Sequence, residues 1–153
     1  MGQRIFALLI GINQYQSENV GNLQGCVRDA ESMRDVLLEH SPNAQISLLT
    51  DGSATRMEIL KAFKQHLFEN PLITKTDAII VYFAGKGQRL PGPAGTPGRD
   101  VDILLPQDYS DETHGISDST LHTLLCDLAK EKGPNIVCFL MLYSGYFRSH
   151  RSA

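Results

Sequence analysis

A lysine between two glycines follows a run of strand-forming residues in the segment VYFAGKGQR, residues 81–89. The carboxyl end of a buried strand is where α/β proteins carry ligands and catalytic groups. Lys86 could therefore act as a catalytic base, bind a phosphate, or remain from a different function. Its ammonium group should reach water from the strand end by snorkelling.

A phosphate-binding loop of the P-loop type does not fit these residues. That motif needs a glycine five positions before the glycine of its Gly-Lys pair, and a serine or threonine directly after the lysine. Here those two positions hold Ile80 and Gly87. The sequence therefore argues against a nucleotide site at Lys86.

Apolar runs and helical periodicity alternate along the chain. Continuous apolar segments, typical of buried strands, cover residues 5–12, 44–50, 77–85 and 135–145. Apolar stripes at helical spacing predict helices over 22–40, from 55 onward, and over 117–134. The Gly- and Pro-rich stretch 87–100 predicts a loop or a loose hairpin, with a short strand in VDILLPQD.

This alternation predicts an α/β fold with a mostly parallel sheet and helices on both faces. Right-handed crossovers give the spatial strand order 2-1-3-4. The winding direction reverses between the first and third strands, and a crevice opens there at the carboxyl ends of the strands. GINQY after the first strand and GKGQR after the third border this crevice.

Four segments lie in the order and on the elements that one protein family uses for its motifs: ALLIGINQY, LQGCVRDAESM, VYFAGKGQ and CFLMLYSG. Together they resemble the caspase-like peptidases, in particular the metacaspases and related proteins of basidiomycete fungi. The resemblance covers residues 5–147, which we expect to form the large-subunit portion of a caspase-like domain, with a tail over 148–153. It implies a Rossmann-like, three-layer fold.

In that family the third strand ends in Tyr-Phe-Ser/Ala-Gly-His-Gly, whose histidine is the general base. The fourth ends in Asp-Cys/Ser-Cys-His-Ser-Gly, whose second cysteine is the nucleophile. The resemblance aligns Lys86 with the position of that histidine and Leu142 with the position of that cysteine. Leucine has no attacking atom, and a lysine of ordinary pKa is a poor base at neutral pH. We therefore expect a pseudoenzyme that acts as a binding or regulatory module.

Two alternatives stay open. Ser144 could work with Lys86 as a Ser–Lys hydrolase, a dyad known in other folds. The chain could instead be a truncated or mutated metacaspase, whose catalytic pair was lost naturally or altered by design.

A residual specificity pocket is a further expectation from the resemblance. In metacaspases the Cys and Asp of Gly-Cys-x-x-Asp-Ala help to form a pocket for Arg or Lys side chains, and here they are Cys26 and Asp29. The second acid of that pocket is replaced by Leu140. Equally, Cys26 would be a buried helix residue and Asp29 a first-turn acid at the positive end of the helix.

Calcium is the cofactor that the resemblance raises, since metacaspases are often calcium-dependent. The segment RDVDILLPQDYSDE offers carboxylates at Asp100, Asp102, Asp108, Asp111 and Glu112. Their spacing does not match an EF-hand loop, so we favour a solvated acidic loop and expect no bound metal.

Composition narrows the class of partner. The net charge of −3 and the absence of a basic stripe argue against nucleic acid and anionic membranes. The three cysteines are too few and too far apart for a disulfide framework or a zinc cluster, so we expect reduced, mostly buried thiols. With no secretion signal or membrane span, we expect an intracellular, cytoplasmic protein.

The strand IVCFLMLY, residues 136–143, carries the last expectation. In the complete family fold this strand is internal, but here only a short tail follows it. A long, apolar, uncharged edge is a template for pairing with another chain. We expect self-association through Ile136 to Tyr143, or docking of a protein partner on the same edge.

Overall fold

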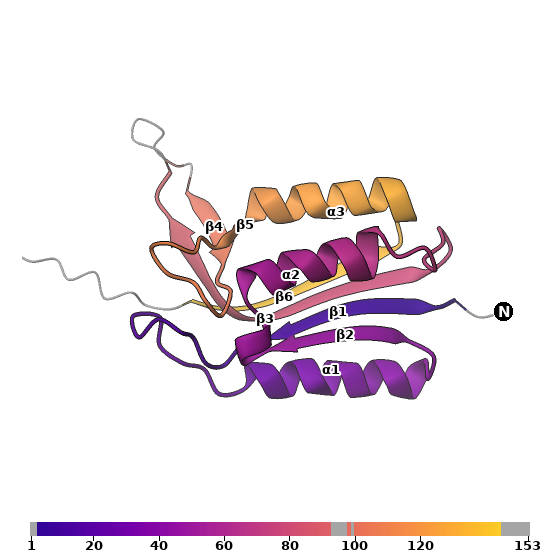
Figure 1. The fold of residues 1–153 in the computed structure, drawn as a ribbon, viewed down its shortest axis with the longest axis horizontal. Helices are drawn as coiled ribbons and strands as arrows, with labels where there is room; N and C mark the ends of the chain where they lie inside the picture. The colour runs from indigo at the N-terminus through magenta and orange to yellow at the C-terminus, as the bar shows by residue number, and fades with distance from the viewer. Residues whose placement is uncertain (1–2, 93–97, 99, 145–153) are drawn as a thin grey trace, which may run out of the picture.

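The computed structural model describes residues 3–92, 98 and 100–144 (Figure 1). Its elements are β1 (Ile5–Gly11), α1 (Cys26–His40), β2 (Gln45–Thr50), η1 (Asp51–Ser53), α2 (Arg56–Ala62), η2 (Phe63–Phe68), β3 (Ala78–Leu90), β4 (Val101–Leu104), β5 (Ile116–Ser117), α3 (Asp118–Lys132) and β6 (Ile136–Ser144). The predicted alternation of strands and helices is confirmed, and so is the short strand in VDILLPQD, which is β4. The expected tail over 148–153 lies outside the described residues.

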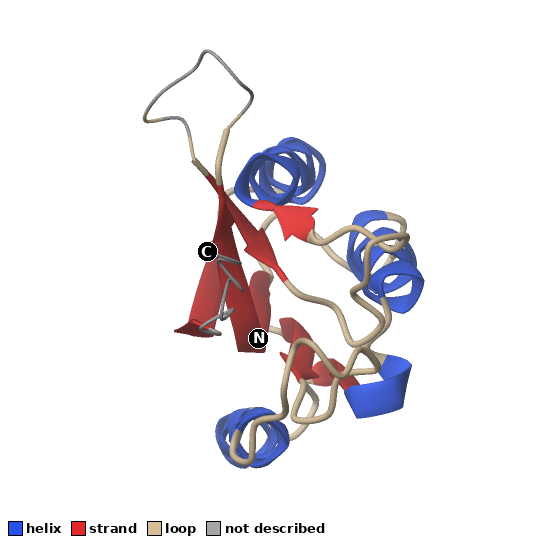
Figure 2. Ribbon diagram, turned by 90° about the vertical axis from the view of Figure 1, so that its left-hand side faces the viewer, coloured by secondary structure: helices blue, strands red, loops and turns tan. Residues whose placement is uncertain are grey.

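The sheet has the predicted parallel order, because β6 is the fourth parallel strand along the chain. β1 pairs in parallel with β2 and β3, and β3 pairs in parallel with β6. Figure 1 shows α2 and α3 above this sheet and α1 below it, and Figure 2 gives a second view of the helices around the strands. The structure is therefore a three-layer α/β fold.

Strand β3 is longer than the sequence indicated. We expected it to end at Gly85 and a loop to follow, but it continues to Leu90. Residues 79–87 pair with β6, and residues 87–90 pair antiparallel with β4. Gly87 has partners on both sides, Ser144 in β6 and Leu104 in β4, so β4 continues the sheet beyond the end of β1. Neighbours distant in sequence thus extend β3 through Lys86.

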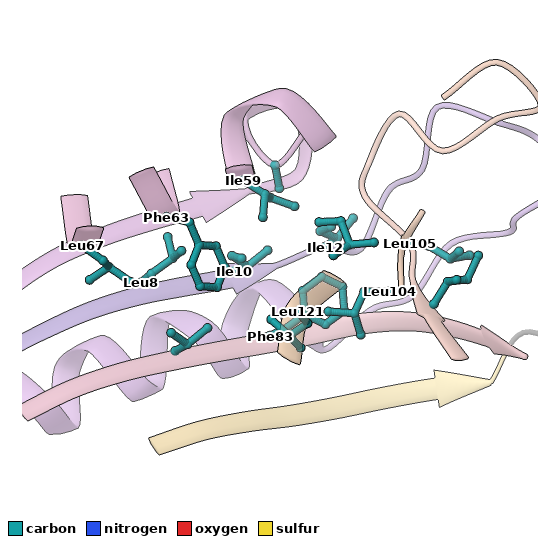
Figure 3. Close-up of a cluster of buried hydrophobic side chains, with 14 of the residues drawn as sticks. Leu8, Ile10, Ile12, Ile59, Phe63, Leu67, Phe83, Leu104, Leu105 and Leu121 are labelled. Atoms are coloured by element: carbon teal, nitrogen blue, oxygen red, sulfur yellow. The ribbon is translucent and has the colours of Figure 1, made fainter. Parts of the chain in front are cut away.

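The core consists of two apolar layers, one on each face of the sheet. Alternate β1 side chains serve both layers: Leu8 and Ile10 face α2 and α3, while Leu9 faces α1. The larger layer also holds residues from η2, β3, β4 and α3 (Figure 3). Because both faces of the sheet are covered, the sequence of β1 is a continuous apolar run and does not alternate between apolar and polar residues.

Side chains at the helix ends set the bounds of α2 and α3. The Thr55 hydroxyl accepts a hydrogen bond from the Glu58 amide, at the start of the helix expected from residue 55 onward. The Ser117 hydroxyl accepts a hydrogen bond from the Thr120 amide at the start of α3. Gly133 follows α3 with a φ of 96°, a conformation that favours glycine.

The expectation of mostly buried thiols holds for only one of the three cysteines. All three thiols are free; Cys26 is buried, whereas Cys126 and Cys138 are half-buried. No helix within the described ranges is long and apolar enough to cross a membrane.

Candidate active site

The loop between β1 and α1 is held over the carboxyl ends of the strands by polar contacts. The Asp51 carboxylate, directly after β2, accepts hydrogen bonds from the amides of Asn13 (2.8 Å) and Gln14 (3.0 Å). The Asn13 side chain in turn accepts from the amides of Cys26 (2.8 Å) and Val27 (3.3 Å) at the start of α1. These contacts satisfy amides that a helix N-terminus leaves without partners.

Lys86, in β3, holds the same loop by two hydrogen bonds. Its backbone amide donates to the Tyr15 hydroxyl at 2.6 Å, and its ammonium nitrogen donates to the Val20 carbonyl. Lys86 is only 8% exposed, and burial lowers its pKa. The expectation that its ammonium group reaches water from a strand end is therefore wrong, because β3 continues past it and the loop covers it.

Lys86 and Leu142 do not face each other. In the register of β3 with β6, Leu142 pairs with Gly85, while Lys86 pairs with Tyr143. Because successive side chains of a strand leave opposite faces, Lys86 lies on the α1 side and Leu142 on the α2–α3 side. Leu142 is 43% exposed, against the buried Lys86.

Ser144 is likewise separated from Lys86. It pairs with Gly87, so its side chain leaves the same face as Leu142. No hydrogen bond connects Ser144 and Lys86, both of which are described residues. The Tyr15 hydroxyl contacts Lys86 at its backbone amide, and the hydrogen bond of the Lys86 amine goes to the Val20 carbonyl.

Cys26 and Asp29 lie together with Tyr82 on the α1 side of the sheet. Cys26 is 1% exposed, and burial raises its pKa to about 11, with smaller contributions from the charges of Asp29 and Asp51. Burial also raises the pKa of Tyr82, and Asp29, Cys26 and Tyr143 raise it further. The Cys26 thiol is therefore protonated at neutral pH and unsuited to nucleophilic attack.

Leu140 is not brought to this group. It pairs with Phe83, whose side chain belongs to the layer under α2 and α3. Of the two positions that the resemblance assigns to pocket acids, Asp29 thus keeps a carboxylate on the α1 side, whereas Leu140 is apolar and lies on the other face.

Two of the five acids considered for calcium have protein partners. Asp102 forms an ion pair with Arg89 at 3.0 Å, and this hydrogen bond lowers the pKa of Asp102. Asp108 accepts from the Arg56 amide at 2.8 Å, at the start of α2. The described part of the chain contains no group of three or more His, Cys, Asp or Glu residues arranged to hold a metal ion.

Sequence reasoning missed the residues that organise the loop. Asn13 and Tyr15 lie in the GINQY segment, which the sequence predicted to border the crevice, and Asp51 directly follows the second strand. Their hydrogen-bond partners are distant in sequence, as in the bonds from the Asn13 amide to Asp51 and from the Lys86 amide to Tyr15. Gly85 is part of the same construction, since a Cβ there would lie 2.8 Å from the Tyr15 hydroxyl oxygen. Polar residues directly after buried strands were the available signal.

The parallel order of β2, β1, β3 and β6, with helices on both faces, defines a caspase-like α/β domain. A crystal structure of a protein from Geobacter sulfurreducens has the same fold, with a TM-score of 0.70 and 20% sequence identity. The match covers 91% of this chain and 49% of that one.

The chain belongs to the metacaspases, because the family model described as metacaspase, peptidase C14 domain matches residues 6–146. It is 27% identical over 128 residues to Metacaspase-1B of Neurospora crassa, covering 78% of this chain and 29% of that protein. It is also 27% identical over 142 residues to Metacaspase-6 of Arabidopsis thaliana, covering 83% of this chain and 38% of that protein. The chain therefore spans well under half the length of these curated relatives.

Proposed function

We propose that this chain is a catalytically inactive metacaspase-like domain that acts as a binding or regulatory module. The observation that carries the proposal is the pair of side chains at the positions of the family's base and nucleophile. Leu142 has no nucleophilic atom. Lys86 is buried, its amine donates to the Val20 carbonyl, and its side chain leaves the opposite face from Leu142. Neither attack on a carbonyl nor proton transfer to a neighbouring nucleophile is supported by this pair.

The same geometry weighs against a Ser–Lys hydrolase. Such a dyad needs the amine within hydrogen-bond reach of the hydroxyl. Ser144 leaves the sheet on the side of Leu142, and the Lys86 amine is already bonded to Val20. An active dyad would require β3 or β6 to change register.

The experiment is a cleavage assay with Arg- and Lys-containing peptides, with and without calcium, and with an active metacaspase as the positive control. We expect no turnover from this chain in either condition. Turnover that is lost in Ser144→Ala and in Lys86→Met would overturn the proposal in favour of the hydrolase. Turnover that survives both substitutions would place the chemistry elsewhere in the domain.

Residual recognition of a cationic side chain at Asp29 is the binding role that we propose for this module. Asp29 is half-buried and lies near enough to the Tyr82 hydroxyl for its charge to raise the pKa of that group. One carboxylate in a partly desolvated site favours a guanidinium or ammonium group, but two would bind it more tightly.

Calorimetric titration with an Arg-containing peptide tests this role. We expect weak binding that is lost in Asp29→Asn. Asp35→Asn on the same helix is the matched control, because Asp35 is exposed and pairs with Arg34. Equal affinity in Asp29→Asn and the parent chain would remove Asp29 from the site.

A further inference from the structure

A groove lies between η2 and α3. Figure 1 shows α2 and α3 side by side above the sheet, and α3 contacts η2, which continues α2. The hollow between the two helices has a volume of about 520 Å³. Apolar side chains dominate both of its walls: Leu60, Phe63 and Phe68 on one, and Leu124 and Leu128 on the other. All of these residues lie in α2, η2 and α3, so β6 takes no part in the groove.

A π-helical turn builds one wall of this groove. In η2 the Glu69 amide donates to the Lys64 carbonyl at 2.7 Å, five residues earlier rather than the four of an α-helix. Residues five positions apart would point about 140° apart on an α-helix. The wider turn brings Phe63 and Phe68 to the same face, where both line the groove while Phe68 stays 41% exposed. Because π turns are rare and frequently occur at functional sites, an exposed aromatic residue held by one indicates a binding surface.

The dimensions of the groove fit two turns of a helix. Its walls run from Leu60 to Phe68 and from Thr120 to Leu128, which spans about 12 Å at 1.5 Å per residue. An amphipathic helix fills such a groove with apolar side chains at positions i, i+3 or i+4, and i+7. Leu128 is 1% exposed at the base of the groove, so the inserted side chains would meet the core.

The rim of the groove is acidic at the η2 end. It carries there the carboxylates of Glu69 and Asp127. Glu69 pairs with Lys64 at 3.7 Å, but both side chains are more than half exposed, so this ion pair contributes little. Two carboxylates against one ammonium group leave this end with a net negative charge.

The α2 end of the groove is basic. A second hollow opens there beside Lys64 and is also lined by Arg56 and Lys61. Asp108, which lines it too, already accepts a hydrogen bond from the Arg56 amide. A ligand that is acidic at one end and basic at the other is therefore complementary to the groove. A helix itself favours acidic residues in its first turn and basic residues in its last.

We propose that the groove between η2 and α3 binds one amphipathic helix of a partner protein, parallel to α2. Apolar side chains of that helix enter the groove, acidic residues of its first turn lie against Arg56 and Lys61, and basic residues of its last turn lie against Asp127. The groove is on the opposite face of the sheet from Asp29. The proposal thus depends neither on the loss of catalysis nor on the cation site, and turnover in the peptidase assay would leave it standing.

Fluorescence anisotropy with a labelled peptide tests the proposal. The probe has leucines at i, i+3 and i+7, glutamates in its first turn and lysines in its last, and a lactam bridge holds it helical because short helices are marginal in water. We expect saturable binding that weakens at least about tenfold in Phe68→Ala, which removes an aromatic anchor. Leu72→Ala is the matched control, since Leu72 is 57% exposed outside the groove and its loss should leave the affinity unchanged.

A charge-reversed probe tests the direction of the bound helix. This probe keeps the leucines and exchanges the glutamates with the lysines, so it should bind the parent chain more weakly than the first probe. Asp127→Lys should weaken the first probe and strengthen the reversed one. Circular dichroism and thermal melting of the three variants show that they fold.

Four results would overturn the proposal. They are the absence of saturable binding, equal affinity in Phe68→Ala and the parent chain, unchanged affinity of both probes in Asp127→Lys, and a small apolar dye that binds the groove but is not displaced by the first probe. The last result would assign the groove to a small apolar ligand.

Discussion

Replacing Lys86 with alanine should lower the free energy of unfolding by about 2 to 4 kcal/mol. The substitution removes three buried methylene groups, at about 0.8 kcal/mol each. The buried Val20 carbonyl also loses its donor, which costs about 1 to 3 kcal/mol more. Relief of the desolvated ammonium group offsets part of this sum. Urea unfolding with an unchanged m-value measures the difference.

Lys86→Met separates the apolar stem from the ammonium group. Methionine keeps the length and apolar contacts of the stem, and relief of the desolvated ammonium group offsets the donor lost from the Val20 carbonyl, so this variant should lie within about 1 kcal/mol of the parent chain. Burial lowers the pKa of Lys86 below 10.5, so between that lowered pKa and 10.5 the unfolded chain binds more protons than the folded one. The parent's stability should therefore gain a contribution as pH rises through this window, and Lys86→Met should lack it.

Two results would refute this reasoning. A loss below about 0.5 kcal/mol in Lys86→Ala would mean that the side chain behaves as an ordinary exposed residue. A loss in Lys86→Met equal to that in Lys86→Ala would mean that the polar contact of the ammonium group, rather than the packing of the stem, holds Lys86 in place.

Three further predictions concern Tyr15, Asp77 and the pair of Lys86 and Leu142. Tyr15→Phe should cost about 1 to 2 kcal/mol in urea unfolding, because the buried Lys86 amide loses its acceptor. Burial raises the Tyr15 pKa, so the parent's stability should fall more steeply than the variant's as pH rises above 10.0. The bond from Arg4 holds the pKa of Asp77 at about 2, so acid titration should show stability lost as pH drops from 3.8 through about 2, and Asp77→Asn should abolish that step. Lys86→His combined with Leu142→Cys should restore little or no peptide cleavage, since the two side chains leave opposite faces; turnover like that of an active metacaspase would contradict this.

Much of the fold was predictable because its signals are local. The buried strands show as continuous apolar runs, as in residues 5–12, and Thr55 with Glu58 marks the start of a helix. The parallel order then follows from chain connectivity and the handedness of crossovers, so the position of β6 beside β3 was predicted correctly.

The candidate site was predictable only in part. The resemblance assigned Lys86, Leu142, Cys26 and Asp29 to motif positions, and the structure places Cys26 and Asp29 together on the α1 side. It does not bring Lys86 to Leu142, because the register of two strands decides which face each side chain leaves. No residue within either segment encodes that register by itself.

The sequence by itself determined the class of fold and the order of the parallel strands. It also determined that Leu142, at the position of the family's nucleophile, has no nucleophilic atom. These depend on residue type, periodicity and connectivity, which act over short stretches of chain. Only the tertiary structure decided that β3 continues through Lys86, that the loop after β1 buries this lysine, and that the register of β6 on β3 turns Lys86 and Leu142 to opposite faces. Each of these depends on partners such as Val20 and Leu104, which lie far away in sequence and come close only when the chain folds.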